Sequence, residues 1–194
     1  MKKNILLGLS IMLLLLTIQG CFPAIRLFVY DGTHKGRVVD ADTGKPIEGV
    51  VVLGVWRTVF ATPGGAVSDF YDARETVTDK DGNFSVPGQG ALIMSNVDVM
   101  QCLIFKAGYK YQRFDWDTLK EGRGQRMKVK WEDNKPIIPL ERLTMEERRR
   151  QGTPSAPPLK APFDKVKLYL KERNKDRVEL GLKPLTLWGG VKYE

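Results

Sequence analysis

The sequence predicts a mainly β fold: an antiparallel sandwich of some seven short strands followed by a helical C-terminal extension. Between residues 35 and 142, short apolar runs rich in β-branched residues alternate with clusters of Asp, Gly, Asn and Pro. Short strands separated by such regular turn signals are typical of a sandwich. From Thr144 the pattern changes to charged, helix-forming segments, and this change predicts an extension over residues 143–194.

The chain begins with a leader that ends at a cysteine. Two lysines near the start precede an apolar stretch over residues 5–18, and Gly20 lies directly before Cys21. A charged start, a short apolar segment and a small residue at the cut form a secretion signal. The stretch is shorter than the ~20 apolar residues that a membrane-spanning helix needs. We therefore expect residues 1–20 to be a signal peptide that is removed.

A cysteine directly after the cut resembles the bacterial lipoprotein signal, in which that cysteine is acylated. The resemblance implies that Cys21 carries the lipid, including palmitate-like acyl chains, and becomes the first residue. Two or more chains anchor a protein stably, so the membrane is an expected partner. Phe22, in place of Asp, implies the outer membrane of a bacterial envelope, facing the periplasm. Gln19 departs from the usual small residue, and an uncut anchor or ordinary secretion are the alternatives.

Residues 21–34 are predicted to form a membrane-proximal stalk, with His34 as a solvated turn residue. The first strand begins at Val38. The Asp/Thr/Gly/Pro cluster over residues 40–46 is typical of a hairpin turn, because short polar side chains cap the backbone there. The apolar run over residues 50–60 predicts a strand that is covered on both faces.

Residues 61–74 contain Pro-Gly-Gly and are predicted to form a long loop. Residues 76–78 and 83–86 flank an Asp-Gly turn, a pattern that predicts a hairpin. Pro139 favours an edge position for the last strand, since proline cannot donate to a ladder. The remaining strands are predicted over residues 99–105, 109–116, 127–131 and 137–140.

The extension begins with a helix whose start is marked by Thr144 and Glu147. Their spacing forms a capping box, in which each side chain satisfies a free backbone N–H group of the first turn. Three arginines follow at the other end, where the helix dipole favours cations. Residues 151–162 contain several prolines and are predicted to be a linker.

A second helix is predicted from Phe163, Val166 and Leu170, whose spacings of three and four residues form an apolar stripe. The stripe fails at Arg173-Asn174, where we expect the helix to break or restart. Gly181 followed by Pro184 ends it. The apolar tail over residues 185–193 is expected to dock somewhere, and the helical extension is expected either to pack back on the sandwich or to reach a protein partner.

Three turn-and-strand motifs occur in the order and spacing of a known domain family. They are residues 36–53, Thr78-Asp79-Lys80-Asp81-Gly82-Asn83-Phe84 and Lys106-Ala107-Gly108-Tyr109. Together they resemble the carboxypeptidase regulatory-like domain, a transthyretin-like (prealbumin-like) β-sandwich frequent in bacterial envelope proteins. The resemblance covers residues 35–142, and the insertion at residues 61–74 departs from it. It implies non-catalytic binding, spacing or stabilising work, and it carries over no catalytic residue.

The motifs that could carry catalytic or metal chemistry are better interpreted as turns between strands. Zinc carboxypeptidase chemistry needs two histidines and a glutamate, and His34 is the only histidine. Asp42-Thr43-Gly44 matches an aspartic-protease triplet, yet that chemistry needs a second carboxylate. The segment from Asp79 starts like an EF-hand loop and then loses the pattern, which leaves one weak calcium contact as an alternative. We expect no catalytic residue, cofactor or metal; an enzyme using carboxylates alone is the weaker alternative.

The charge pattern and the second cysteine add two further expectations. The chain has 31 Lys and Arg against 23 Asp and Glu, a net charge of +8. Its cations are interleaved with acids, whereas nucleic-acid binding needs clustered cations on one face, so we expect no nucleic-acid partner. Cys102 lies in an apolar run and is expected to behave as a small buried hydrophobe.

The predicted function is that of a non-catalytic envelope lipoprotein: a membrane-tethered binding or structural module acting through contacts with an envelope protein. The alternative is a carbohydrate- or peptidoglycan-binding module with an exposed aromatic face. Tyr109 and Tyr111 would share one face of their strand, and Phe114 and Trp116 the other, so only one pair could stack on a sugar. Core packing is the plainer interpretation of these aromatics.

Overall fold

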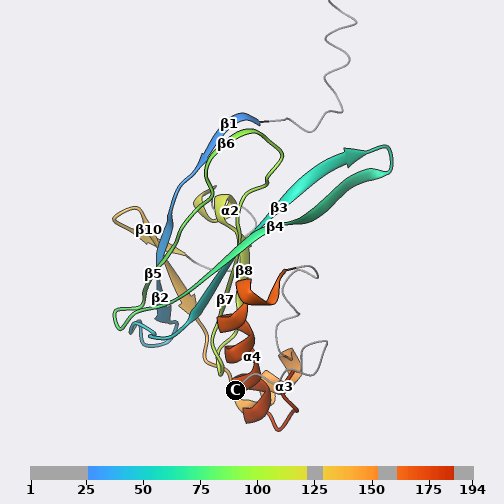
Figure 1. The fold of residues 1–194 in the computed structure, drawn as a ribbon. Helices are drawn as coiled ribbons and strands as arrows, with labels where there is room; N and C mark the ends of the chain where they lie inside the picture. Colours follow the sequence, from blue (N-terminus) through green and yellow to red (C-terminus); the bar gives the residue numbers. More distant parts are fainter. Residues whose placement is uncertain (1–25, 122–128, 153–160, 186–194) are drawn as a thin grey trace, which may run out of the picture.

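A computed structural model describes residues 26–121, 129–152 and 161–185 (Figure 1). The described chain is mainly β with a C-terminal helix, as the sequence predicts, but it forms ten strands where seven were expected. The strands are β1 Arg26–Asp31, β2 His34–Asp40, β3 Val51–Thr62, β4 Gly65–Val77, β5 Asn83–Val86, β6 Gly90–Ser95, β7 Gln101–Phe105, β8 Gln112–Asp115, β9 Lys130–Glu132 and β10 Lys135–Leu140. The helical elements are α2 Trp116–Glu121, α3 Met145–Gln151, the short 3-10 helix η2 Phe163–Lys165 and α4 Lys167–Glu179.

The strands form three sheets. Two have four strands, in the orders β5-β2-β10-β9 and β4-β3-β7-β8, and the third is the pair β1-β6. All pairings are antiparallel except β2 with β10, which is parallel, so the expectation of an entirely antiparallel fold is wrong at that pair. β10 is an interior strand, but β9 pairs only with residues 135–137. Pro139 therefore has a neighbouring strand on one side alone among the described residues, which is where proline is tolerated.

The predicted loop over residues 61–74 is wrong, because these residues form most of β4. β3 and β4 pair continuously from Val51 opposite Val77 to Thr62 opposite Gly65, with a bulge between Trp56 and Arg57. The Pro-Gly turn is confined to the tip, and the residues after it regain strand-forming β-branched and aromatic side chains. The far half of this hairpin projects from the body as an arm (Figure 1).

The hairpin predicted around Asp79–Gly82 is also wrong, although the turn is present. β4 pairs with β3 and β5 pairs with β2, so this turn carries the chain from one four-stranded sheet to the other. Asp79 Oδ1 accepts hydrogen bonds from the backbone N–H groups of Asp81 (2.9 Å) and Asn83 (2.8 Å). The hydrogen bonds within the turn are the same in a hairpin and in a connection between two sheets. Only the pairing of the flanking strands with distant strands distinguishes the two arrangements.

The predicted stalk over residues 21–34 contains regular structure from residue 26 onward. β1 pairs with β6, a strand that the sequence analysis missed, and His34 is the first residue of β2. Val29 and its partner Leu92 point inward, and Leu92 packs on the main core. The described part of this segment thus belongs to the folded body.

The core has two parts, one on each face of the central sheet β4-β3-β7-β8. The inner part joins the two four-stranded sheets and includes Val50 and Val52. The outer part includes Val51 and Leu53, which pack against Tyr169 of α4. The run at the start of β3 is therefore covered on both faces, as its composition predicts. Cys102 is buried in the inner part, as expected.

The first helix of the extension has the predicted start. The capping box at Thr144 and Glu147 is complete. Arg148 is buried: its guanidinium Nε donates to Asp176 of α4 (3.2 Å), and Nη2 donates to Glu179 (2.8 Å). This ion pair joins α3 to α4.

The second helix differs from the prediction because α4 continues through Arg173-Asn174 without a break. Asn174 is buried, and its side chain holds the returning chain: Oδ1 accepts from the N–H of Leu185 (2.8 Å), and Nδ2 donates to the carbonyl of Leu185 (3.4 Å). Asn174 is thus kept in the helix by its hydrogen bonds to Leu185, which lies outside the helix. At the other end, Glu75 of β4 accepts from the N–H groups of Leu168 and Tyr169 and caps the helix start.

The described extension packs on the outer face of the central sheet (Figure 1), the first of the two alternatives for its docking. Residues 186–194, the rest of the predicted docking tail, lie outside the described residues. No helix in the described ranges is long and apolar enough to cross a membrane.

Candidate functional site

The candidate site is a cavity of about 500 Å³ between β1, the start of β2 and the turn that joins β9 to β10. Two buried tryptophans, Trp56 and Trp116, form its apolar floor. A third, Trp131, is 38% exposed at the wall. Polar side chains complete the lining: Asp31, His34, Lys35, Asp98, Asp117, Asp133, Asn134 and Lys135. An apolar concavity with a few polar groups is the usual form of a ligand site.

Asp31 is the polar centre of this cavity. Its Oδ1 accepts from His34 Nε2 at 2.8 Å, and its Oδ2 accepts from Trp56 Nε1 and from the N–H of Gln89, each at 2.8 Å. Burial opposes ionisation of this carboxyl, but the hydrogen bonds from His34, Gln89 and Trp56 outweigh it, so the pKa of Asp31 is lowered. The carboxylate therefore ties β1, β2, β3 and the start of β6 together.

His34 is buried, and the prediction of a solvated turn residue is wrong. Its ring contacts two tryptophans, with its centroid 6.1 Å from that of Trp56 and 5.0 Å from that of Trp116. The Asp31 carboxylate fixes Nε2 as a hydrogen-bond donor, which sets the orientation of the ring. These two aromatic contacts help to hold the imidazole at the wall of the cavity.

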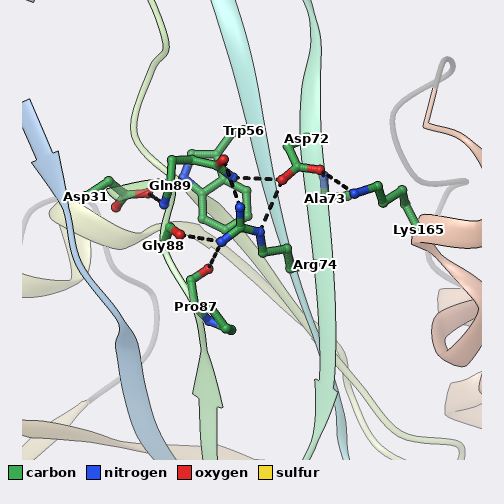
Figure 2. A network of polar contacts seen from close by, with 9 residues as sticks. All are labelled: Asp31, Trp56, Asp72, Ala73, Arg74, Pro87, Gly88, Gln89 and Lys165. Carbon is green, nitrogen blue, oxygen red and sulfur yellow. Dashed lines mark hydrogen bonds and ion pairs between the residues drawn. The ribbon is translucent and has the colours of Figure 1, made fainter. Parts of the chain in front are cut away.

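The polar network continues beside the cavity through Arg74 of β4 (Figure 2). The guanidinium lies 5.6 Å above the Trp56 ring, a cation–π contact. It donates to the backbone carbonyls of Pro87 (3.1 Å) and Gly88, and to Gln89 Oε1 (3.1 Å). Arg74 thereby fixes the segment between β5 and β6 against β3 and β4.

Asp72 carries the same network to the C-terminal extension. Its Oδ2 accepts from Arg74 Nε and Gln89 Nε2, both at 3.1 Å, and its Oδ1 forms an ion pair with Lys165 of η2 at 3.0 Å (Figure 2). Burial opposes ionisation, but hydrogen bonds from Gln89, Lys165 and the Ala73 N–H outweigh it, and the pKa of Asp72 is lowered. A continuous polar chain thus links the cavity wall to the extension.

A second hollow, of about 770 Å³, lies over the outer face of the sheet β5-β2-β10-β9 and is lined by paired surface charges. One such pair is Lys110 with Glu141, at 2.7 Å and well exposed on both sides. Exposed pairs of this kind contribute little. The cavity at Asp31 is the stronger candidate because its central pair, Asp31 and His34, is largely buried and held in place by hydrogen bonds before any ligand arrives.

The four aromatics proposed for ligand stacking are divided differently from the prediction. Tyr109, Phe114 and Trp116 all pack on the inner core, and Tyr111 packs on the outer core. Trp116, at the start of α2 instead of on a strand, is 4% exposed and is the one member that lines the cavity. The structure therefore brings three of the four together around one core, but not as an exposed face.

The other singled-out positions lie apart from the cavity. Cys21, the predicted lipidation site, is outside the described residues. Asp42 is exposed in the turn over residues 40–46, where Asp40 Oδ1 accepts from the N–H groups of Asp42 and Thr43. This geometry agrees with the turn interpretation. Within the described ranges, no three His, Cys, Asp or Glu side chains are grouped as a metal site would require.

Sequence reasoning missed the site because its residues come from distant segments. Asp31, Trp56 and Gln89 meet only when β1 and β6 pair, and both strands were unassigned. A usable signal existed: the residues from Leu27 to Tyr30 are aromatic or strongly apolar throughout, which favours a strand over a solvated stalk.

Comparisons with known proteins assign no family. No family model matches the sequence, and no curated protein matches it. Among solved structures, a pilus adhesin from Streptococcus pneumoniae is 14% identical, with a TM-score of 0.34, over 58% of this chain and 15% of the adhesin. A 9R-lipoxygenase from Cyanothece is 18% identical, with a TM-score of 0.25, over 57% of this chain and 13% of the enzyme. The chain thus spans a small part of either protein.

Proposed function

We propose that this protein is a non-catalytic binding module, tethered to the bacterial envelope by a lipid on Cys21, with the cavity at Asp31 as its ligand site. The observation that carries the proposal is the arrangement of this cavity. Tryptophan rings form its floor and wall, and its central carboxylate accepts three hydrogen bonds from the protein. Such a site is built to hold its shape.

The state of Asp31 supports binding over catalysis. A general base must be free to take a proton from a substrate, whereas both oxygens of Asp31 already accept hydrogen bonds. The lowered pKa keeps this carboxyl ionised, so it cannot serve as a general acid near neutral pH either. The Asp31–His34 pair is therefore best interpreted as a support for the cavity wall.

The ligand class proposed for the cavity is an envelope glycan. Sugar rings have one flat, mostly apolar face and a rim of hydroxyl groups. Trp131 offers a partly exposed flat ring, while Asp98, Asp117 and Asn134 supply acceptors and donors in the lining of the same cavity. This deepens the carbohydrate-binding alternative from the sequence, with Trp131 in place of the aromatic pairs chosen there.

We also propose that the two four-stranded sheets are a carboxypeptidase regulatory-like, transthyretin-like sandwich that has gained β1, β6 and the β3–β4 arm. The shared inner core between the sheets supports this assignment. The arm supports a second candidate function, docking of an envelope protein. Phe60 and Val67 face each other across the arm, and both are exposed. Such a pair suits a protein contact.

Binding measured by calorimetry with soluble peptidoglycan fragments tests the glycan proposal. The detergent-purified full chain is titrated beside two variants, Trp131→Ala and Tyr71→Ala. Tyr71 is a partly exposed aromatic of β4 that does not line the cavity. We expect saturable binding, weakened ~10-fold or more by Trp131→Ala, which corresponds to ~1.4 kcal/mol, and unchanged by Tyr71→Ala.

Two results would contradict the proposal. If the parent protein does not bind the fragments, a glycan is not the ligand. If Trp131→Ala and Tyr71→Ala weaken binding equally, the cavity is not the binding site. A Phe60→Ala variant separates the second candidate function, because it should weaken capture of an envelope protein and leave glycan binding intact.

A further inference from the structure

The pair β1–β6 has an outer face made of exposed apolar side chains. The register places Phe28 opposite Ile93 and Tyr30 opposite Ala91, so all four lie on one face. Phe28 is 65% exposed, Tyr30 72% and Ile93 71%. The opposite face points inward through Val29 and Leu92, so a packed sheet holds these side chains outward. We call Phe28, Tyr30, Ala91 and Ile93 the outer patch.

The outer patch has no cover within the described residues. Leu27 and Met94 are also well exposed at the free end of the two strands, but the register places them on the opposite face, so they are not part of the outer patch. The acidic group of this sheet, Asp31, is turned inward to His34 and Trp56, and β6 contains no charged residue. Exposed apolar surface of this kind marks a contact site.

The position of the patch along the chain indicates what covers it. Cys21 lies five residues before Arg26, the first residue of β1. A fully extended chain of that length reaches about 18 Å, so a lipid on Cys21 holds the start of β1, at Arg26, within that distance of the bilayer surface. The headgroup layer is itself ~5–8 Å deep on each side, and β1 is about 20 Å long. The patch is thus the apolar surface nearest to the tether in sequence.

We propose that the outer patch of β1–β6 lies in the headgroup region of the phospholipid bilayer, as a second membrane contact beside the lipid anchor. The proposal rests on the lipid tether of the proposed function. It adds that the folded body has a fixed orientation relative to the bilayer. Phe28 and Ile93 supply apolar area, and the Tyr30 phenol suits the boundary between lipid and water. The membrane contact would orient the body by its β1–β6 end, with α4 at the opposite end (Figure 1).

Spin labels test this orientation. Full-length protein, purified from its bacterial host, carries a nitroxide at Phe28→Cys, Ile93→Cys or Leu182→Cys and is placed in phosphatidylethanolamine–phosphatidylglycerol vesicles. Leu182 is exposed and follows α4, and it serves as the matched control. Cys102 does not compete for label, because it is fully buried and burial raises the pKa of its thiol.

We expect the ratio of oxygen to nickel-complex accessibility at positions 28 and 93 to be severalfold higher than at position 182. Equal ratios at all three positions, with the protein retained on the vesicles, would overturn the membrane contact and leave the tether standing. Spin–spin broadening between labels at position 93 would overturn it in favour of a second copy of the chain. Labelling of Cys21 itself, with loss from the vesicles, would overturn the tether and with it the inference.

Discussion

The substitution Asp31→Ala tests the role of this carboxylate as the support of the cavity. It removes the acceptor for three donors at once: His34 Nε2, Trp56 Nε1 and the Gln89 N–H. Trp56 is almost completely buried, so water cannot replace the lost partner of its indole N–H. A buried donor left without a partner costs ~1–3 kcal/mol. Trp56 Nε1 and His34 Nε2 belong to buried side chains, whereas Gln89 is only partly buried, so we count the first two and expect a loss of ~2–4 kcal/mol in the free energy of unfolding.

Urea unfolding followed by tryptophan fluorescence measures this loss. The exposed turn residue Asp42 supplies the control, because Asp42→Ala should stay within ~0.5 kcal/mol of the parent. The Trp56→Phe variant removes the indole donor and keeps a smaller aromatic ring, and a double-mutant cycle with Asp31→Ala separates their hydrogen bond from the packing that Trp56→Phe loses by itself. A loss below ~0.5 kcal/mol for Asp31→Ala, or additive effects in the cycle, would refute the reasoning.

Ionisation of Asp31 should also make the free energy of unfolding depend on pH. The pKa of Asp31 is lower in the folded protein than in the unfolded chain, where it is near ~3.9. A lowered folded pKa contributes stability that is present above the unfolded pKa and is lost as the pH falls through the folded one. The parent protein should therefore lose stability below about pH 4, and Asp31→Ala should lose less over that range.

Three further substitutions test other parts of the fold. Glu75→Ala removes the acceptor that caps α4 and should cost ~0.5–2 kcal/mol, with faster amide exchange in the first turn of that helix. Gly82→Ala should cost ~1–3 kcal/mol, because Gly82 has φ +76° and a Cβ there would meet the Val38 carbonyl oxygen; Gly64→Ala, at the open tip of the arm, should be nearly neutral. Arg148→Ala leaves the buried Asp176 carboxylate unpaired and should cost ~3–5 kcal/mol, whereas Lys110→Ala, at an exposed pair, should cost less than ~1 kcal/mol. Thermal unfolding and hydrogen exchange report all three, and a Gly64→Ala or Lys110→Ala effect as large as that of its counterpart would contradict these assignments.

Local chemistry explains which features the sequence could predict. The Asp79 turn, the Thr144 capping box and the strand at Val50 depend on neighbours within a few residues, and the structure contains each of them. The continuity of α4 could not be predicted in this way. Asn174 is unfavourable in an isolated helix interior, and it remains helical because the chain returns to it at Leu185.

The candidate site was harder to predict for the same reason. Trp116 was among the aromatics singled out, but the cavity also needs Asp31, which pairs with residues 25 and 58 positions away along the chain. No local motif marks such contacts. The pairing of β5 with β2, instead of with β4, is a similar case, because a turn fixes its own geometry and not the sheet that its strands join.

The lipid on Cys21 is the premise shared by the tethered binding module and the membrane-facing outer patch. Intact mass measurement of the protein extracted from its host envelope, with fragmentation of the N-terminal peptide, tests it most directly. We expect the mature chain to begin at Cys21 and to carry a diacylglyceryl group on the sulfur. A chain that begins elsewhere, or a free thiol at Cys21, would contradict the account.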